Sequence, residues 1–183
     1  DTSLVGGGGA KGLCGPGVID AAAACVRCGR IDDTGRIDED SPLYAVYGSE
    51  FDGFPALKIG DSGVLITQQD IRKLQLAKSA VAAGVLTMLS DSGCTMDEIS
   101  TLYLAGGFGS YVDIRSAAAI GLIPEALEGK VTVIGNAAGA GASMLLLDRS
   151  AEEREQAIVS CAEEINLSAN PTFMDHYVEQ MMF

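Results

Sequence analysis

Residues 101 to 111 read TLYLAGGFGSY, an apolar-rich stretch that runs into two adjacent glycines, an aromatic residue, a third glycine, a serine and a tyrosine. The first five residues, 101–105, are typical of a buried strand. A glycine pair at the carboxyl end of a strand allows another group to approach the backbone closely. That group is either a flat ligand or a tightly packed helix, and these residues alone do not distinguish the two.

The elements that follow predict an α/β fold. They alternate in the order strand, helix, strand, helix, at residues 101–105, 114–121, 131–135 and 136–148. This order favours parallel strands covered by helices. Ligands of such sheets bind beyond the carboxyl ends of the strands. We therefore expect Gly106, Gly107 and Gly109 to gather there. Gly135 and Asn136, at the end of the next strand, should lie beside them.

Small residues also fill the helix that begins after Asn136. Gly139 and Gly141 stand in the run AAGAGA, residues 137–142. Two glycine-bearing loops with little side-chain bulk suit a base and a ribose, so adenosine is the expected ligand. The alternative is that the small residues serve only close helix packing. A glycine-rich loop by itself is weak evidence for either.

The longest predicted helix spans residues 67–89. Thr67 is a suitable N-cap and Asp70 lies in the first turn. One face carries apolar residues at helical spacing: Ile71, Leu74, Ala77, Val81, Val85 and Met88. We also expect helices at 14–28, 150–164 and 170–183. In the helix 150–164, Ser150 should be the cap and Glu153 should complete a capping box. Strands are expected at 2–5, 43–48, 64–67 and 165–168.

Bulk properties limit the partners. The 183 residues suit one domain, 1–183, and no apolar run reaches the roughly 20 residues that cross a bilayer. The net charge of −13, without a Lys/Arg stripe, argues against nucleic acid and anionic membranes. The sequence begins at Asp1, without a methionine or an Arg/Lys-then-apolar stretch, so we expect an excised segment rather than a secretory precursor. An odd number of scattered cysteines, five, favours the reducing cytoplasm.

The cysteines do not form a ligand pattern. Cys25 and Cys28 have the Cys-x-x-Cys spacing of a redox or half-metal site, with Cys14 nearby. They follow an alanine run, and the single histidine, His176, is far along the chain. Free cysteine is often a small buried apolar residue, so we favour a packed helix over a metal site and expect no metal.

No catalytic set emerges from the sequence. The run GGGGAKGLCGPG, residues 6–17, fails as a phosphate loop because Lys11 is not followed by serine or threonine. Gly15 and Gly17 still offer N–H groups near a helix start, where an anion could bind. The carboxylates near expected loops and helix starts are Asp20, Asp61, Asp70 and Asp113. Each of them can equally be a cap or a turn residue.

Four stretches, in this order, resemble the C-terminal domain of the reductive activators of corrinoid proteins: residues 66–89, 102–124, 133–147 and 170–183. The segment GLCGPGVIDAAA, 12–23, is similar to that family's Gly-Ile-Cys-Gly-Ser-Gly-hydrophobic-Ile-Asp stretch. The resemblance covers nearly the whole chain. It implies the fold of acetate and sugar kinases, heat-shock proteins and actin, that is, an actin-like (ribonuclease H-like) lobe with a mixed sheet covered by helices.

The resemblance also implies a nucleotide site. Gly106, Gly107, Phe108 and Gly109 would form the adenosine motif. The second connecting helix would contain Gly139, Ala140, Gly141 and Ala142. We expect Ser110 and Asn136 to join this site. The glycines that end the strand at 101–105 would then allow the nucleotide to approach.

The family implies a larger reaction. Its members use ATP, with magnesium, to drive an electron from an N-terminal iron–sulfur cluster to a cobalt(II) corrinoid protein of a methyltransferase system. The ferredoxin-like cysteines and the phosphate loops of the fold are not found in this chain, and Pro16 replaces the serine of the family stretch. We therefore expect an incomplete lobe that is not catalytic alone. A homodimer is possible.

Two rival functions remain open at this point. The first is a lobe of a small-molecule kinase with the same fold, although no substrate-binding signature stands out. The second is a structural module for dimerisation or docking, in which the glycines serve packing and no nucleotide binds.

Overall fold

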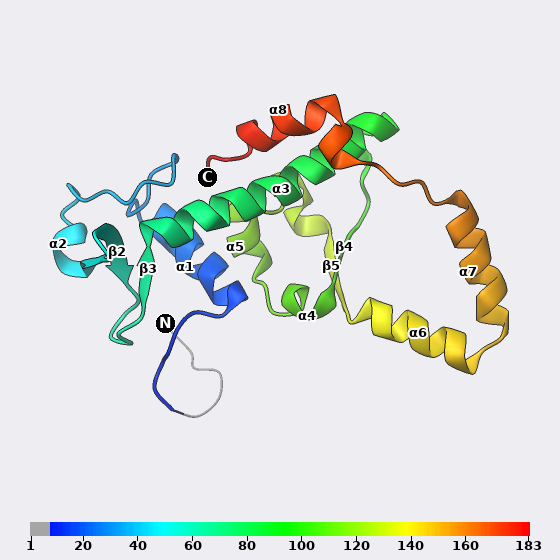
Figure 1. Cartoon of the computed structure of the whole chain (residues 1–183), viewed down its shortest axis with the longest axis horizontal. Helices are drawn as coiled ribbons and strands as arrows, with labels where there is room; N and C mark the ends of the chain where they lie inside the picture. The colour runs from blue at the N-terminus through cyan, green and yellow to red at the C-terminus, as the bar shows by residue number, and fades with distance from the viewer. Residues whose placement is uncertain (1–7) are drawn as a thin grey trace.

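The computed structural model of the chain describes residues 8–183 (Figure 1), so the strand end expected at 2–5 lies outside the described residues. The helices are α1 Gly15–Arg27, α2 Tyr44–Tyr47, α3 Gln68–Ser92, α4 Gly106–Gly109, α5 Ile114–Ala119, α6 Ala137–Leu147, α7 Ser150–Cys161 and α8 Pro171–Glu179. The strands are β1 Gly48–Phe51, β2 Phe54–Lys58, β3 Leu65–Thr67, β4 Leu102–Ala105 and β5 Val131–Gly135. Short 3-10 turns lie at Met96–Glu98, Glu125–Lys130 and Leu167–Ala169.

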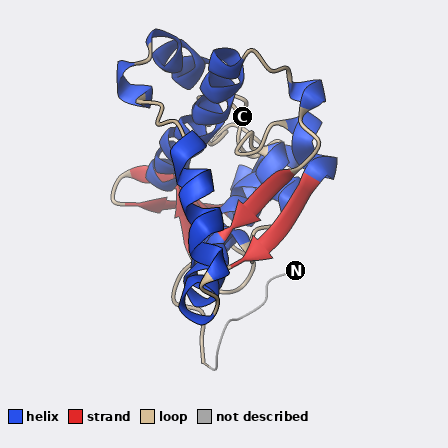
Figure 2. Cartoon of the chain, turned by 90° about the vertical axis from the view of Figure 1, so that its right-hand side faces the viewer, coloured by secondary structure: helices blue, strands red, loops and turns tan. Residues whose placement is uncertain are grey.

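The strands form two separate small sheets, drawn in red in Figure 2. An antiparallel meander has the order β1-β2-β3, and β4 pairs with β5 in parallel. The predicted α/β class and the parallel pairing of 101–105 with 131–135 are confirmed. Parallel and antiparallel strands thus both occur, but among residues 8–183 they do not share one sheet.

The start of α3 forms as the sequence predicts. Asp70 N donates to Thr67 Oγ1 over 3.1 Å, and Thr67 N donates to Asp70 Oδ2 over 3.0 Å, which completes a capping box. The predicted apolar face is wrong in part, because Val81 and Met88 are 52% and 48% exposed. The helix instead buries polar residues, namely Gln75, Lys78 and Ser79.

Those polar residues are buried because the C-terminal segment lies along α3 (Figure 1). Gln75 Nε2 donates to the carbonyl of Met181 over 2.8 Å, and Ser79 Oγ donates to the carbonyl of Gln180 over 2.8 Å. The ammonium of Lys78 donates to the carbonyl of Met182. Side chains of α3 therefore donate hydrogen bonds to the backbone carbonyls of three successive residues that follow α8. α8 itself begins at Pro171, as predicted.

The apolar core surrounds α1. Ile19, Ala22 and Ala23 are at most 2% exposed, and α1 packs against α5. Pro16 stands in the first turn, where its missing N–H breaks no helical bond, as the sequence predicts. The small side chains let α5 approach closely, so the position of α1 is fixed relative to the turn that precedes α5.

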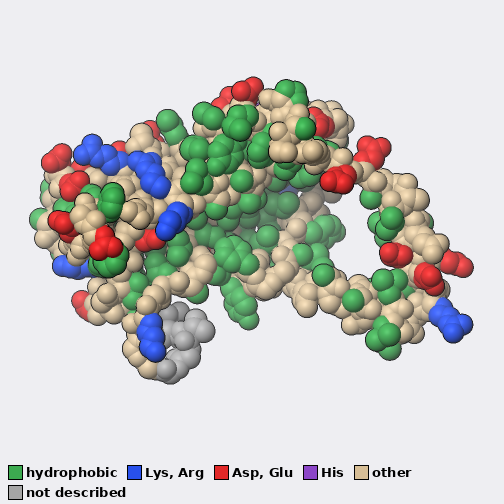
Figure 3. Space-filling model, viewed as in Figure 1, with side chains coloured by type: hydrophobic (Ala, Val, Ile, Leu, Met, Phe, Trp, Pro, Cys, Tyr) green, Lys and Arg blue, Asp and Glu red, His purple; other side chains and the backbone are tan. Residues whose placement is uncertain are grey.

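The helices α6 and α7 project from the body as an arm (Figures 1 and 3). No residue of α6 is buried, and Leu146 and Leu147 are 85% and 84% exposed. Among residues 8–183, α7 is the element against which α6 packs most. The close helix contact that the small residues of α6 suggested is therefore not made within the described part of the chain.

Three local predictions are wrong. Ser150 is the first residue of α7 rather than its cap, because the Asp148 carboxylate accepts from Ser150 N over 2.9 Å and from Ser150 Oγ over 2.7 Å. The capping box with Glu153 does not form. The stretch 43–48 contains the helical turn Tyr44–Tyr47, and 165–168 contains a 3-10 turn instead of a strand.

Candidate functional site

The carboxyl ends of β4 and β5 lie at one edge of the parallel sheet. Ala105 pairs with Gly135, so Gly106 and Asn136 follow their strands at the same place, as the strand order predicts. Gly106 has φ +92° and Gly135 has φ +62°. Residues with a side chain rarely adopt these backbone angles, so each strand can turn here because glycine occupies the position.

The glycines of the turn after β4 have different surroundings. No atom lies within 4 Å of the place where a Cβ on Gly106 or Gly107 would stand. A Cβ on Gly109 would lie 2.8 Å from Leu104 Cγ. Gly106 and Gly107 therefore leave the strand end open to another group, whereas Gly109 is a packing glycine. The turn is a single helical turn, α4, where the sequence suggested a loop.

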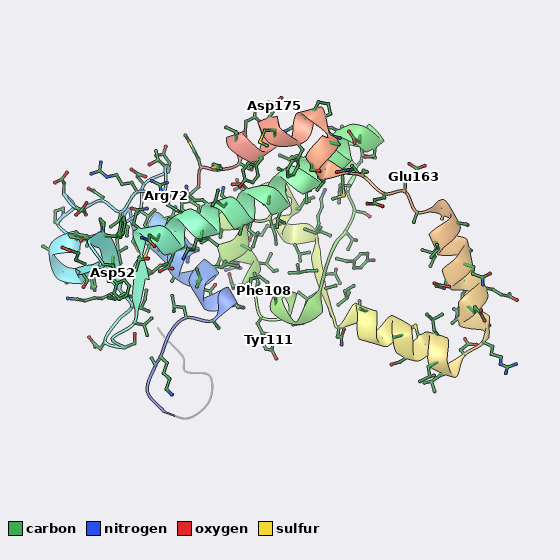
Figure 4. The ribbon with its side chains drawn as sticks, in the orientation of Figure 1. Asp52, Arg72, Phe108, Tyr111, Glu163 and Asp175 are labelled. Atoms are coloured by element: carbon green, nitrogen blue, oxygen red, sulfur yellow. The ribbon has the colours of Figure 1, made fainter. Side chains whose placement is uncertain are left out.

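Phe108 fixes this turn against the start of α1 (Figure 4). A Cβ on Gly15 would lie 2.5 Å from Phe108 Cε2, so the ring rests directly on the backbone of Gly15. Phe108 nevertheless remains 53% exposed. Tyr111, just after the turn, is 79% exposed. An aromatic ring with a free surface thus stands next to the open glycines.

The α6 side of the edge is formed by a capping residue. Asn136 Oδ1 accepts from Gly139 N over 3.0 Å and so caps α6. A Cβ on Gly139 would lie 2.5 Å from Asn136 Nδ2, so the glycine makes room for the capping amide. A Cβ on Gly141 would meet no atom within 4 Å. On the α4 side, Ser110 Oγ donates to the carbonyl of Gly106 over 3.0 Å.

The candidate acids do not gather at this edge. Asp70 is part of the capping box of α3, and Asp113 Oδ1 accepts from Ser116 N over 2.8 Å as the cap of α5. Asp20 and Asp61 are exposed residues of α1 and of the loop before β3. Both caps have the structural roles that the sequence offered as alternatives to catalysis.

The five cysteines form no disulfide bonds and differ in exposure. Cys25 is buried in α1, and this burial raises the pKa of its thiol. A raised pKa opposes the thiolate form that binds metals. Cys14, Cys28, Cys94 and Cys161 are exposed. Within residues 8–183, no three His, Cys, Asp or Glu side chains are grouped so that they could hold a metal ion. The residues present therefore do not fit an iron–sulfur cluster.

Two hollows in the described part of the chain lie away from the glycine turn. One is lined by α3 residues together with Thr34, Met181 and Met182. The other lies beside the β1–β2 hairpin and the start of α3. Neither includes a residue from the carboxyl ends of β4 and β5.

Sequence reasoning missed two features of this edge. The sequence points to Gly15 only through its N–H group, although the ring of Phe108 lies against its backbone. The sequence gives Tyr111 no role beyond its place at the end of the glycine stretch. Their separation along the chain hides the first contact, because no periodicity joins a helix start to a turn 93 residues later. The exposure of Tyr111 depends on how the turn leaves the sheet.

Comparison with known proteins gives a consistent result. The family model described as the C-terminal domain of RACo, the ASKHA domain, matches residues 1–183. The corrinoid activation enzyme RamQ of Eubacterium limosum is 32% identical over 193 aligned residues that cover 99% of this chain. The [Co(II) methylated amine-specific corrinoid protein] reductase of Methanosarcina barkeri is 26% identical over 95% of this chain.

A solved structure is also similar. The reductive activator for a corrinoid, iron–sulfur protein superposes with a TM-score of 0.82 and 33% identity over 93% of this chain. The chain spans only part of each relative: 32% of the Eubacterium protein, 29% of the Methanosarcina protein and 28% of the solved activator. Among the described residues, no helix is both long enough and apolar enough to cross a membrane.

Proposed function

Because this chain belongs to the family of the C-terminal ASKHA domain of RACo, we propose that it is the nucleoside-binding lobe of an ATP-dependent activator of corrinoid proteins. The activator would reduce cobalt(II) corrinoid for methyl transfer. The relatives whose names mention corrinoid activation or reduction support this proposal, and they align with almost the whole chain. The reaction belongs to the longer protein of which such a lobe is one part.

One observation carries the nucleotide assignment: the space at Gly106 and Gly107 is open at the carboxyl edge of a parallel sheet. This is where ligands of such sheets bind. In our proposal the adenosine lies against Gly106 and Gly107, with Phe108 beside it and Gly109 and Ser110 completing the turn. On the facing side, Asn136 caps α6, and Gly139 and Gly141 lie in its first turns. The free space at Gly141 leaves room for the nucleotide or for the rest of the protein.

The cofactors and partners follow from the family. ATP with magnesium would supply the free energy that drives an uphill electron transfer. We place the iron–sulfur cluster in another domain of the activator, since the cysteines of this chain do not fit one. The partner would be the corrinoid protein of a methyltransferase system, in the cytoplasm. The exposed apolar residues of the arm, such as Leu146 and Leu147, offer surface for it or for a homodimer.

Calorimetric titration of the full-length activator with ATP tests the proposal. Gly107→Val would place a branched side chain in the open space and lower ATP affinity by at least about tenfold, or about 1.4 kcal/mol. Gly129→Ala is the control, because a Cβ there also meets no atom within 4 Å but lies in the turn Glu125–Lys130. Unchanged ATP affinity in a folded Gly107→Val protein contradicts the adenosine assignment.

A further inference from the structure

The ring of Phe108 and the backbone of Gly15 form the contact that joins α4 to α1. The missing Cβ of Gly15 would stand 2.5 Å from Phe108 Cε2 and 3.1 Å from Cδ2. A real Cβ essentially never stands closer than 3.0 Å to another heavy atom, so the ring of Phe108 would have to shift if residue 15 carried a side chain. The backbone angles of Gly15 are helical and do not themselves require glycine.

The support under the ring is rigid. Gly15 is the first residue of α1, whose Ile19, Ala22 and Ala23 are almost fully buried in the core. Closely packed interiors resist displacement, so the buried residues that begin one turn after Gly15 hold α1 in place. A second fixed contact lies beneath the turn, where Gly109 packs on Leu104. The turn is therefore held on two sides, whereas the side of Gly106 and Gly107 is open.

Burial does not explain the aromatic ring. Phe108 remains 53% exposed, so much of the free energy that burial of a phenylalanine provides is not gained. A half-exposed ring, held on one side by backbone and adjacent to an open glycine turn, has the features of a wall for a flat ligand. Aromatic rings stack on nucleobases whichever base is present.

From this contact we infer that Gly15 is a positioning residue of the nucleoside site: it holds Phe108 where the ring bounds the space over Gly106 and Gly107. This inference rests on the proposed function. It gives α1 a part in the site, through the ring rather than through its N–H groups. A side chain at residue 15 would displace the ring into or away from the ligand without touching the ligand itself.

The test measures affinities of the full-length activator for ATP and for adenosine by calorimetry. Gly15→Ala should weaken both by the same factor, about tenfold, because the ring acts on the nucleoside and not on the phosphates. Gly12→Ala is the matched control, since its Cβ would meet no atom within 4 Å and its φ is not positive. It should bind both ligands as the wild type does.

A double-mutant cycle shows whether the ring carries the effect. Phe108→Ala removes the atoms that the new methyl group would meet, so adding Gly15→Ala to Phe108→Ala should cause no further loss of adenosine affinity. A further loss overturns the inference, because the methyl group then acts through something other than the ring. Unchanged affinity of Gly15→Ala in a protein that binds ATP also overturns it, while the proposed function stands.

Two other outcomes are informative. If the wild-type protein binds neither ATP nor adenosine, the proposed function fails and the inference fails with it. If Gly15→Ala does not fold, Phe108→Leu replaces it, because leucine keeps an apolar contact with α1 but has no flat face. Phe108→Leu must then weaken adenosine binding at an unchanged melting temperature. Adenosine affinity equal to that of the wild type would overturn the inference.

Discussion

The ammonium of Lys78, in the middle of α3, donates a hydrogen bond to the backbone carbonyl of Met182, near the C-terminal end of the chain. Lys78 is 1% exposed, and its Nζ also lies 5.5 Å from the centre of the Phe183 ring. None of the ion pairs formed among residues 8–183 involves this charge. A buried cation held by a carbonyl and a ring fixes the end of the chain to α3 at the cost of its hydration.

We expect Lys78 to make stability depend on pH in the alkaline range. Burial lowers its pKa from 10.5 to about 8. Between about pH 8 and pH 10.5 the unfolded chain binds more protons than the folded chain, so the free energy of unfolding contributed by this group rises with pH. Below about pH 8 the group is charged in both states and the full penalty of burying the charge remains.

Lys78→Met tests this, because methionine has similar length and no charge. The difference in melting temperature between Lys78→Met and the wild type should change steadily across the range from pH 8 to pH 10, with the wild type gaining relative to the variant. Subtracting the variant removes the titration of tyrosines and other lysines. A difference that stays constant with pH would show that the pKa of Lys78 is not lowered in the folded protein, as expected if its ammonium is hydrated in solution.

Gln75 should be a major determinant of how firmly the C-terminal segment is held. Its amide donates to the carbonyls of Thr34 and Met181 over 3.0 and 2.8 Å, and it accepts from Arg72 over 2.8 Å. Gln75→Ala would leave two carbonyls without this donor, and we expect a loss of about 2 kcal/mol in urea unfolding. Lys73→Ala, an exposed position on the same helix, is the control. Equal losses in the two variants would contradict the assignment.

The face of α3 illustrates what the sequence could not predict. Helical spacing correctly gave the helix, and Thr67 with Asp70 correctly gave its start, because a cap and its partner are only three residues apart. The spacing pointed to Val81 and Met88 as core residues, yet both are about half exposed. The covering segment presents backbone carbonyls, so polar side chains of α3 face it. That complementarity joins residues more than 100 positions apart.

The candidate site also has some features that the sequence predicts and others that it does not. Strand 131–135 was predicted with its observed ends because Gly135 stops an apolar stretch, and the strand order placed Gly106 near Asn136. The sequence does not show which glycines leave free space and which serve packing. A Cβ on Gly107 would meet no atom within 4 Å, whereas Gly109 packs on Leu104. Ser150 was misread because Asp148, two residues earlier, competes for the same hydrogen bonds.

The helix α6 should depend strongly on its cap. It buries no residue, so tertiary packing contributes little and Asn136 supplies a fixed partner for Gly139 N. Asn136→Ala should cost about 1 kcal/mol locally and increase amide exchange in 137–147 several-fold. Exchange in α3 should not change. If α6 exchanges at the same rate in both proteins, the helix is held by contacts other than its cap.

Gly107 and Gly109, two residues apart in α4, should respond in opposite ways to the same added methyl group. A Cβ on Gly109 meets Leu104 at 2.8 Å, so Gly109→Ala should destabilise the fold by about 1–3 kcal/mol, as overpacking of a core does. Gly107→Ala meets no atom within 4 Å and exchanges glycine for a better helix former, so the melting temperature should stay equal or rise slightly. Leu104→Val in the Gly109→Ala protein should restore part of the loss, because it shortens the side chain that the methyl group meets. Equal melting temperatures of the two alanine variants would show that α4 does not pack on Leu104. The contact between Gly109 and Leu104 would then not be what positions Gly106 and Gly107.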